Sequence, residues 1–228
     1  MPIGLQMRYA VGMAHTRWPL AFTAASALCF AALGAPALCA PVTYIVVPGP
    51  LQMARFDAST QTEHYSGRTN QVSGMLQFDD AAPAQATAQF SVKLSSLATG
   101  SSLRDSNMRR LVLQTDTFPT ATFRLTRLAP PVAPLLPGQT AHVLAQGTLT
   151  LHGVTQPVLA PVDVTRETGA GGLPGLHLAV RFVVRLADYN LHAPRFLFFT
   201  VRQEHTLTAD LHAVAALRRE RPAAARRN

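Results

Sequence analysis

The sequence predicts an all-β fold, an antiparallel β-sandwich or closed β-barrel of about eight strands with one short helix. Apolar residues recur at every second position in nine stretches of the 228-residue chain, and turn-forming residues separate these stretches. Because neighbouring side chains of a strand point to opposite faces, each stretch has one apolar and one polar face, as in antiparallel sheet. The apolar content of 48% supplies a core and excludes a chain that is disordered throughout.

The alternation marks the strands that we expect. It is clearest over residues 176–186, where Leu, Val and Phe occupy every second position. In chain order the segments are 43–47, 54–59, 72–78, 88–94, 121–126, 148–152, 158–164, 176–186 and 206–213. Turns are expected between them at Asp79-Asp80, Gly100, Pro130-Pro131, Pro137-Gly138, Gly153 and residues 169–172. Many short strands in one domain favour a sandwich or a barrel.

Residues 103–113 are the one plausible helix in the middle of the chain. Ser102, with Asp105 three residues later, resembles a capping box at the start of this helix. Pro119 prevents the helix from continuing. We interpret Arg104 and Asp105 as a local ion pair that orders the entry to the helix.

The formal net charge of +8 lies mostly at the two ends of the chain. The first 40 residues contain two arginines and no acidic residue, and residues 218–228 contain five arginines and one glutamate. Residues 41–217 carry 13 basic and 11 acidic residues and are nearly neutral. A nucleic-acid partner, which a basic chain first suggests, is therefore not expected, and we predict that residues 218–228 are a disordered Arg-rich tail.

Residues 1–40 are predicted to be a signal peptide. They combine a basic start, an uncharged apolar run over residues 20–33 and a small-residue exit. The cleavage position is open between Ala37 and Ala40. The alternative, a transmembrane anchor, is disfavoured because prolines interrupt the continuation of the apolar run. Membrane contact is compatible with this reading, but an integral membrane protein is not expected.

Both cysteines fall in or beside this leader, at positions 29 and 39. Cleavage after Ala40 leaves a protein without cysteine, and hence without a disulfide framework or thiol chemistry. We expect the protein in the periplasm or secreted.

A search for catalytic and cofactor motifs is negative. The chain contains no Gly-rich phosphate loop, no Ser nucleophile elbow and no paired-carboxylate spacing. Its histidines are scattered, and His205 and His212, seven residues apart, should lie on opposite faces of one strand. We expect no cofactor, no metal site and no enzymatic activity.

Three stretches together resemble the YceI-like family of exported proteins. The first runs from a strand through Ser96-Leu97-Ala98-Thr99-Gly100 and Arg104-Asp105 to Phe118-Pro119. The second, and most specific, is Gly-Thr-Leu-Thr-Leu-His-Gly-Val-Thr-Gln-Pro-Val over residues 147–158. The third is the strand that ends in Asp188-Tyr189. Order and spacing agree with the family from about residue 44 to residue 214.

The resemblance implies a lipocalin-like antiparallel β-barrel over residues 41–217 that holds a long apolar isoprenoid or other lipid in its interior. The chain departs from the family pattern over residues 47–51 and at Asn107, where the family has a histidine. These differences concern contacts with the head group of the ligand more than the fold. The oligomeric state is open.

The alternating apolar residues are candidates for the wall of the ligand cavity, and two tyrosines for its mouth. The wall candidates are Phe90, Val92, Phe123, Leu125, Leu149, Leu151, Val180, Phe182 and Val184, and the mouth candidates are Tyr44 and Tyr189. The same residues can equally form a packed core. The alternative function is therefore a solid-core β-sandwich that serves as an interaction module without a small-molecule ligand.

Overall fold

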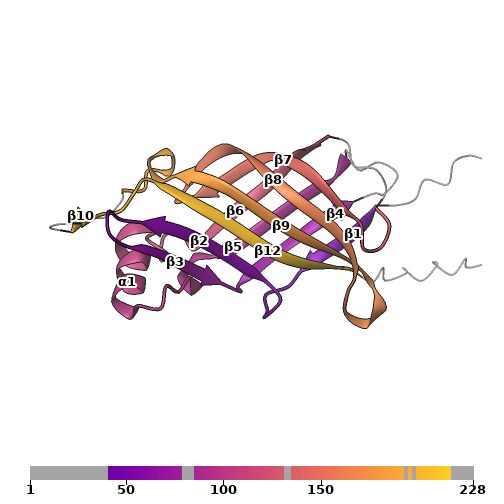
Figure 1. The fold of residues 1–228 in the computed structure, drawn as a ribbon, viewed down its shortest axis with the longest axis horizontal. Coiled ribbons are helices and arrows are strands. Elements are labelled where there is room, and N and C mark those ends of the chain that lie inside the picture. Colours follow the sequence, from indigo (N-terminus) through magenta and orange to yellow (C-terminus); the bar gives the residue numbers. More distant parts are fainter. Residues whose placement is uncertain (1–40, 79–84, 131–134, 193–194, 197–198, 217–228) are drawn as a thin grey trace, which may run out of the picture. The chain divides into compact units, whose positions relative to one another are not determined.

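The computed structural model describes residues 41–78, 85–130, 135–192, 195–196 and 199–216 (Figure 1). The signal peptide predicted over residues 1–40 and the tail predicted over residues 218–228 lie outside the described residues. Within these ranges, no helix has the length and apolar character needed to cross a membrane.

The described residues are mainly strands. The strands are β1 (Val42–Val46), β2 (Met53–Ser59), β3 (His64–Thr69), β4 (Val72–Phe78), β5 (Thr87–Lys93), β6 (Thr120–Ala129), β7 (Thr140–Leu151), β8 (Val154–Thr168), β9 (Pro174–Arg185), β10 (Arg195–Phe196), β11 (Phe199–Thr200) and β12 (Glu204–Ala215). The helical elements are η2 (Leu94–Ser96), α1 (Ser102–Asn107), the π-helical turn η3 (Met108–Val112), η4 (Ala170–Gly172) and η5 (Leu186–Tyr189).

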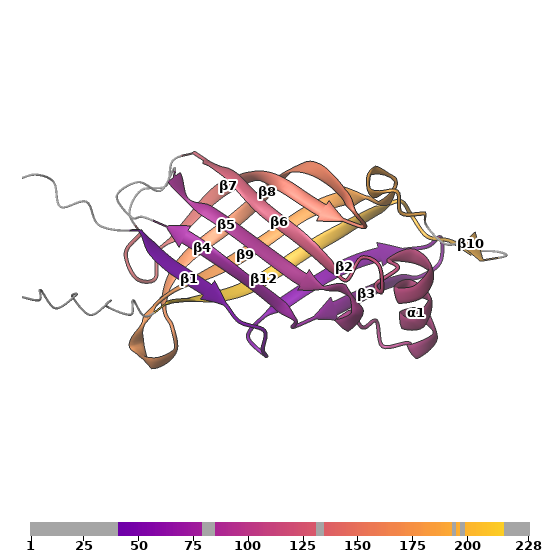
Figure 2. The same cartoon turned by 180° about the vertical axis from the view of Figure 1, so that it is seen from behind.

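Ten strands form one antiparallel sheet that closes on itself. Their order is β1-β4-β5-β6-β7-β8-β9-β12-β2-β3, and β1 also pairs with β12, where Tyr44 lies opposite Ala215. β12 pairs with β9 along one edge, and with β2 and then β1 along the other. Figures 1 and 2 show the resulting barrel from two opposite sides. The predicted barrel is confirmed, and the alternative of a β-sandwich is wrong.

The strand count of eight follows from two interrupted strands. β1 pairs with β4 while β2 pairs with β3, so residues 42–78 form one long hairpin in two halves. Gly49 and Pro50 lie at the interruption between β1 and β2. With each interrupted strand counted once, eight strands enclose the interior, a size whose interior is just wide enough for side chains or one slender ligand.

The strand β3 was not among the predicted strands. Its sequence, His-Tyr-Ser-Gly-Arg-Thr, lacks apolar alternation because Gly67 stands at an inward position opposite Phe56. A Cβ on Gly67 would collide with the ring of Phe56. The phenylalanine ring thus supplies the apolar surface that β3 itself lacks.

The predicted helix is shorter than expected and begins with a different cap. α1 ends at Asn107, and the chain continues through the π-helical turn η3. The N-cap is Ser101, whose hydroxyl accepts a hydrogen bond from the Arg104 N–H at 3.4 Å, so the expected capping box at Ser102 is wrong. Asp105 instead accepts hydrogen bonds from the N–H and the hydroxyl of Thr99, at 2.8 and 2.6 Å. This buried carboxylate ties the helix to the preceding loop.

The buried apolar side chains on the inner face of the barrel form two clusters. The first includes Tyr44, Leu76, Leu176 and Ala213. The second lies where η2, η3 and η5 meet the strands and includes Leu94 and Leu186. Residues of both clusters line an unfilled space in the interior.

Candidate functional site

A cavity of about 570 Å³ lies inside the barrel. This volume falls within the roughly 300–1,000 Å³ of small-molecule binding sites. Its wall is almost wholly apolar and takes inward side chains from strands all around the barrel. Apart from the predicted residues given below, it includes Ala54, Phe56, Val72, Leu76, Phe78, Leu128, Val162, Leu178, Leu207 and Leu211. The interior is therefore hollow and not a solid core.

All nine wall candidates lie on this cavity. They are Phe90 and Val92 on β5, Phe123 and Leu125 on β6, Leu149 and Leu151 on β7, and Val180, Phe182 and Val184 on β9. They could be predicted because the alternation along each strand identifies which side chains point inward. Their contact with a ligand stays a prediction.

The two mouth candidates do not line the cavity. Tyr44 is 1% exposed and packs in the first buried cluster, where it lies opposite Leu76 of β4. Tyr189 is 3% exposed and packs in the second cluster. Burial, and to a smaller extent the charge of Asp188, raises the pKa of the Tyr189 hydroxyl. The expectation that these tyrosines form the mouth is corrected, since both are core residues.

Pairs of glycine and phenylalanine shape the wall of the cavity. Gly74 lies opposite Phe90 and Gly67 lies opposite Phe56 on neighbouring strands. A Cβ on either glycine would collide with the ring of its partner, and a Cβ on Gly147 would collide with Phe123. The missing side chains let the three rings occupy space beside the backbone. We infer that the glycines keep these rings from filling the interior.

One end of the cavity is covered by the helical segment. Side chains from α1 and η3, including Leu103, Met108 and Val112, contribute to the lining. Figure 1 shows α1 beside β2 and β3 at this end of the barrel. The polar lining residues also come largely from this region. They are Arg55, Thr60, Glu63, Tyr65, Ser101, Arg104 and Asn107, with His205 and Thr208 on β12.

Arg104 organises the polar end of the cavity. Its guanidinium lies 4.5 Å from the centre of the Tyr65 ring and pairs with Glu63 at 3.2 Å. It also donates to the hydroxyl and the carbonyl oxygen of Thr99, at 2.9 and 3.2 Å. The predicted ion pair with Asp105 is therefore corrected: Arg104 pairs with Glu63, and Asp105 is held by Thr99.

Tyr65 and His205 are the titratable groups of this end whose pKa departs from its ordinary value. Burial raises the pKa of Tyr65, with the positive charge of Arg104 opposing the rise and Glu63 adding to it. Burial lowers the pKa of His205, while a hydrogen bond to the Arg202 carbonyl opposes the decrease. The His205 ring stacks on the Phe56 ring, with the two ring centres 6.0 Å apart. The lowered pKa favours the neutral imidazole, which forms part of the cavity wall.

These polar residues were not among the predicted cavity residues. Arg104 was assigned to the helix entry, and Tyr65 lies on the strand that the alternation did not reveal. The inward position of His205 follows from the alternation of β12, in which Leu207 and Ala209 also face the cavity. His205 and His212 lie on opposite faces of β12, as predicted.

Among the described residues, one group of possible metal ligands lies outside the cavity. His177, Asp210 and His212 meet on the outer wall, where β9 and β12 pair. The expectation of no metal site rested on their scattered positions in the sequence.

Comparisons with known proteins agree with this architecture. The model of the YceI-like domain matches residues 51–213. No curated protein matches the chain closely enough to count as a relative.

Solved structures with a similar fold share little sequence with the chain. A polyisoprenoid-binding domain from Saccharophagus degradans, implicated in plant cell wall breakdown, is 21% identical with a TM-score of 0.61, over 77% of this chain and 99% of that one. BcnA of Burkholderia cenocepacia is 19% identical with a TM-score of 0.58, over 72% and 96%. The YCEI protein of Campylobacter jejuni is 16% identical with a TM-score of 0.52, over 66% and 84%. These likenesses support the fold.

Proposed function

Because this chain belongs to the YceI-like domain family, we propose that its barrel binds one long apolar lipid, an isoprenoid above all. The observation that carries the proposal is the interior cavity of about 570 Å³ with its apolar wall. The polyisoprenoid-binding domain from Saccharophagus degradans, which has a similar fold, supports the choice of ligand. The proposed role is binding, with no catalytic step.

Burial of the hydrocarbon provides the affinity in this proposal. Each CH₂ group removed from water contributes about 0.8 kcal/mol, before the cost of association is subtracted. A slender chain that follows the barrel axis would contact Phe, Val and Leu side chains along its length, without any charged anchor. This explains why the lining can be apolar over most of its surface.

The polar end of the cavity gives the ligand a direction. Arg104, Tyr65 and His205 lie at the end covered by α1 and η3, whereas the residues of the first buried cluster that line the cavity, such as Leu76 and Val162, are apolar. A polar head group would be stabilised beside Arg104, and the apolar tail would extend into the barrel. We therefore propose that the lipid enters with its tail first from the α1 end.

Export to the periplasm or the exterior is part of the same proposal, and it rests on the leader pattern of residues 1–40. Contact with a membrane would then be peripheral and serve to collect or deliver lipid. Nucleic acid is not a proposed partner. Identification of the N-terminal residue of the exported protein tests this assignment.

The binding proposal is tested by organic-solvent extraction of the protein from its native host, followed by mass spectrometry. We expect one lipid species per barrel, and we expect delipidated protein to take up added isoprenoid. Repeated absence of lipid together with no uptake would contradict the proposal.

A pair of neighbouring variants tests where the lipid lies. Phe182→Asp should abolish uptake, because it introduces a charge into the apolar cavity wall. Val183→Asp is the matched control, since Val183 is the next residue on β9, faces outward and is 59% exposed. It should leave uptake unchanged. Equal uptake by the two variants, both folded by circular dichroism, would remove Phe182 from the site.

A further inference from the structure

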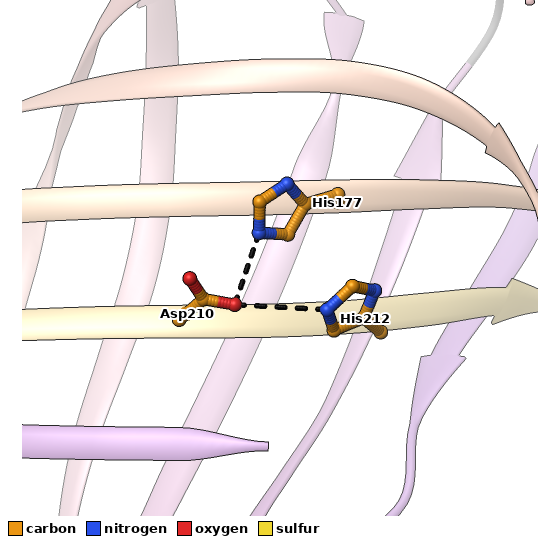
Figure 3. A group of neighbouring side chains, drawn as sticks. All are labelled: His177, Asp210 and His212. Atoms are coloured by element: carbon orange, nitrogen blue, oxygen red, sulfur yellow. Dashed lines mark hydrogen bonds and ion pairs between the residues drawn. The ribbon is translucent and has the colours of Figure 1, made fainter. Parts of the chain in front are cut away.

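His177, Asp210 and His212 converge on the outer wall of the barrel. Figure 3 shows both imidazole rings turning a nitrogen toward the same carboxylate oxygen of Asp210. The distance from this oxygen is 2.9 Å to His177 Nε2 and 3.6 Å to His212 Nε2. The potential ligand atoms of the three residues all lie within 4.8 Å of one another.

The pairing of β9 with β12 produces this convergence. His177 and His212 lie directly opposite each other on the two strands. Asp210 stands two positions before His212 and therefore shares its face. The two imidazole rings stack with centres 4.6 Å apart and an angle of 18° between their planes. Two regular strands thus hold three ligand side chains in one place without any loop.

Residues around His212 hold its ring in one orientation. The Nδ1 atom of His212 lies 2.8 Å from a carboxylate oxygen of Glu167 on β8. In the tautomer that donates from Nδ1 to this carboxylate, the lone pair of Nε2 faces Asp210 and His177. A carboxylate on the far nitrogen of a histidine is the common arrangement behind metal-bound imidazoles.

The backbone of His212 is held as well. The buried Gln52 side chain accepts from the His212 N–H and donates to the His212 carbonyl, both at 3.0 Å. These bonds fill the gap that the interruption between β1 and β2 leaves beside β12. The position of the imidazole is therefore fixed at both the side chain and the backbone.

A glycine opens the path between Glu167 and His212. Glu167 lies on β8, so its side chain must cross β9 to reach β12, and it passes the position of Gly175, its partner on β9. A Cβ on Gly175 would approach the Gly169 backbone N to 3.1 Å and the Glu167 side chain to 3.2 Å. The absence of a side chain at Gly175 therefore leaves room both for the Gly169 backbone and for the side chain of Glu167.

We propose that His177, Asp210 and His212 bind one divalent transition-metal ion, Zn²⁺ above all, with Glu167 as the positioning residue of His212. Zinc bonds of about 2.0–2.1 Å in a tetrahedron place neighbouring ligand atoms about 3.3 Å apart. The two observed distances to Asp210, 2.9 and 3.6 Å, bracket this separation, and the two histidine nitrogens lie within 4.8 Å of each other.

The donor set indicates the class of ion. Two imidazoles and one carboxylate suit zinc and its neighbours, whereas Ca²⁺ and Mg²⁺ take oxygen ligands. The side chains of His177, His212 and Asp210 are 28%, 29% and 41% exposed. Solvent therefore has access to a fourth coordination position, as in sites with three protein ligands and one water.

The test is a Zn²⁺ titration of the untagged chain by isothermal calorimetry, with Cys29→Ser and Cys39→Ser present to remove competing thiols. We expect one Zn²⁺ per chain and a loss of at least tenfold in affinity for His177→Ala and for His212→Ala. His142→Ala is the matched control, because His142 pairs with Asp163 at 2.6 Å on the exposed outer wall. It should bind as the parent chain does.

Two further measurements separate metal binding from a structural role. The visible spectrum of added Co²⁺ should show tetrahedral nitrogen and oxygen ligation in the parent and lose it in the His177→Ala and His212→Ala variants. Glu167→Gln should keep the stoichiometry of one and weaken binding by about tenfold or more. Absence of Zn²⁺ binding by the parent, retention in a His177→Ala/His212→Ala double variant, or an equal loss in His142→Ala would overturn the proposal.

Discussion

The inner and outer faces of β9 and β12 have opposite chemistry, although the same two strands carry both. Inward, Leu178 and Leu211 belong to the apolar wall of the cavity. Outward, His177 and His212 stack beside Asp210. A period of two residues therefore places the proposed lipid site and the proposed metal site on opposite sides of one layer of backbone.

The histidines of β12 make the comparison sharpest. His205 faces inward, stacks on Phe56 and has its pKa lowered by burial. His212 faces outward, between the carboxylates of Glu167 and Asp210. The same side chain is thus a neutral part of the wall at one position and a polar ligand candidate at the other. The two faces should respond differently to substitution.

The largest difference is expected between two leucines on neighbouring strands. Leu178 is buried on the inner face of β9, and Leu159 on the outer face of β8 is 55% exposed. Leu178→Ala should lower the free energy of unfolding by about 2–5 kcal/mol, because it removes buried apolar contacts and enlarges the cavity. Leu159→Ala should change it by no more than about 0.5 kcal/mol. Denaturant unfolding of delipidated protein measures both, and equal losses would contradict the assignment of faces.

A smaller effect is expected at the glycines. Gly67→Ala should displace the Phe56 ring from the wall into the cavity, which lowers stability by about 1–3 kcal/mol and reduces lipid uptake. Gly49 is the control, since a Cβ there meets only one backbone oxygen, at 3.9 Å. Gly49→Ala should leave stability unchanged or raise it by at most about 1 kcal/mol. Unchanged uptake and stability in Gly67→Ala would show that Phe56 does not depend on the missing side chain.

The smallest effect is expected in the pH dependence of stability, because one partly buried group carries it. Burial lowers the pKa of His205 in the folded protein, so the unfolded chain takes up a proton first as the pH falls. The contribution of neutral His205 should therefore be lost as the pH falls below about 6.5, the ordinary pKa of histidine. Unfolding of the parent and of His205→Phe from about pH 7.5 to about pH 5 should show a steeper loss in the parent. Parallel curves would contradict this assignment.

Much of the barrel could be predicted because alternation is a local property of the chain. The alternation over residues 176–186 and 206–213 predicted β9 and β12. The nine wall candidates are inward residues of four strands. The strand β3 was missed because the apolar surface at Gly67 belongs to Phe56 on its neighbour. The cap of α1 was misassigned by one residue, since Ser101 and Ser102 are equally suitable in sequence and Asp105 is held by Thr99.

The sequence by itself determined which side chains of each strand share a face, and with that the apolar character of the interior. This follows because the pleat of a strand depends only on the local backbone. The tertiary structure alone decided that the sheet closes through β1 and β12, that Tyr44 packs in the core, and that Arg104 meets Glu63 and Tyr65. It also brought His177 and His212, 35 positions apart, face to face. Strand register and closure depend on contacts between distant segments, and such contacts leave no regular spacing in the sequence.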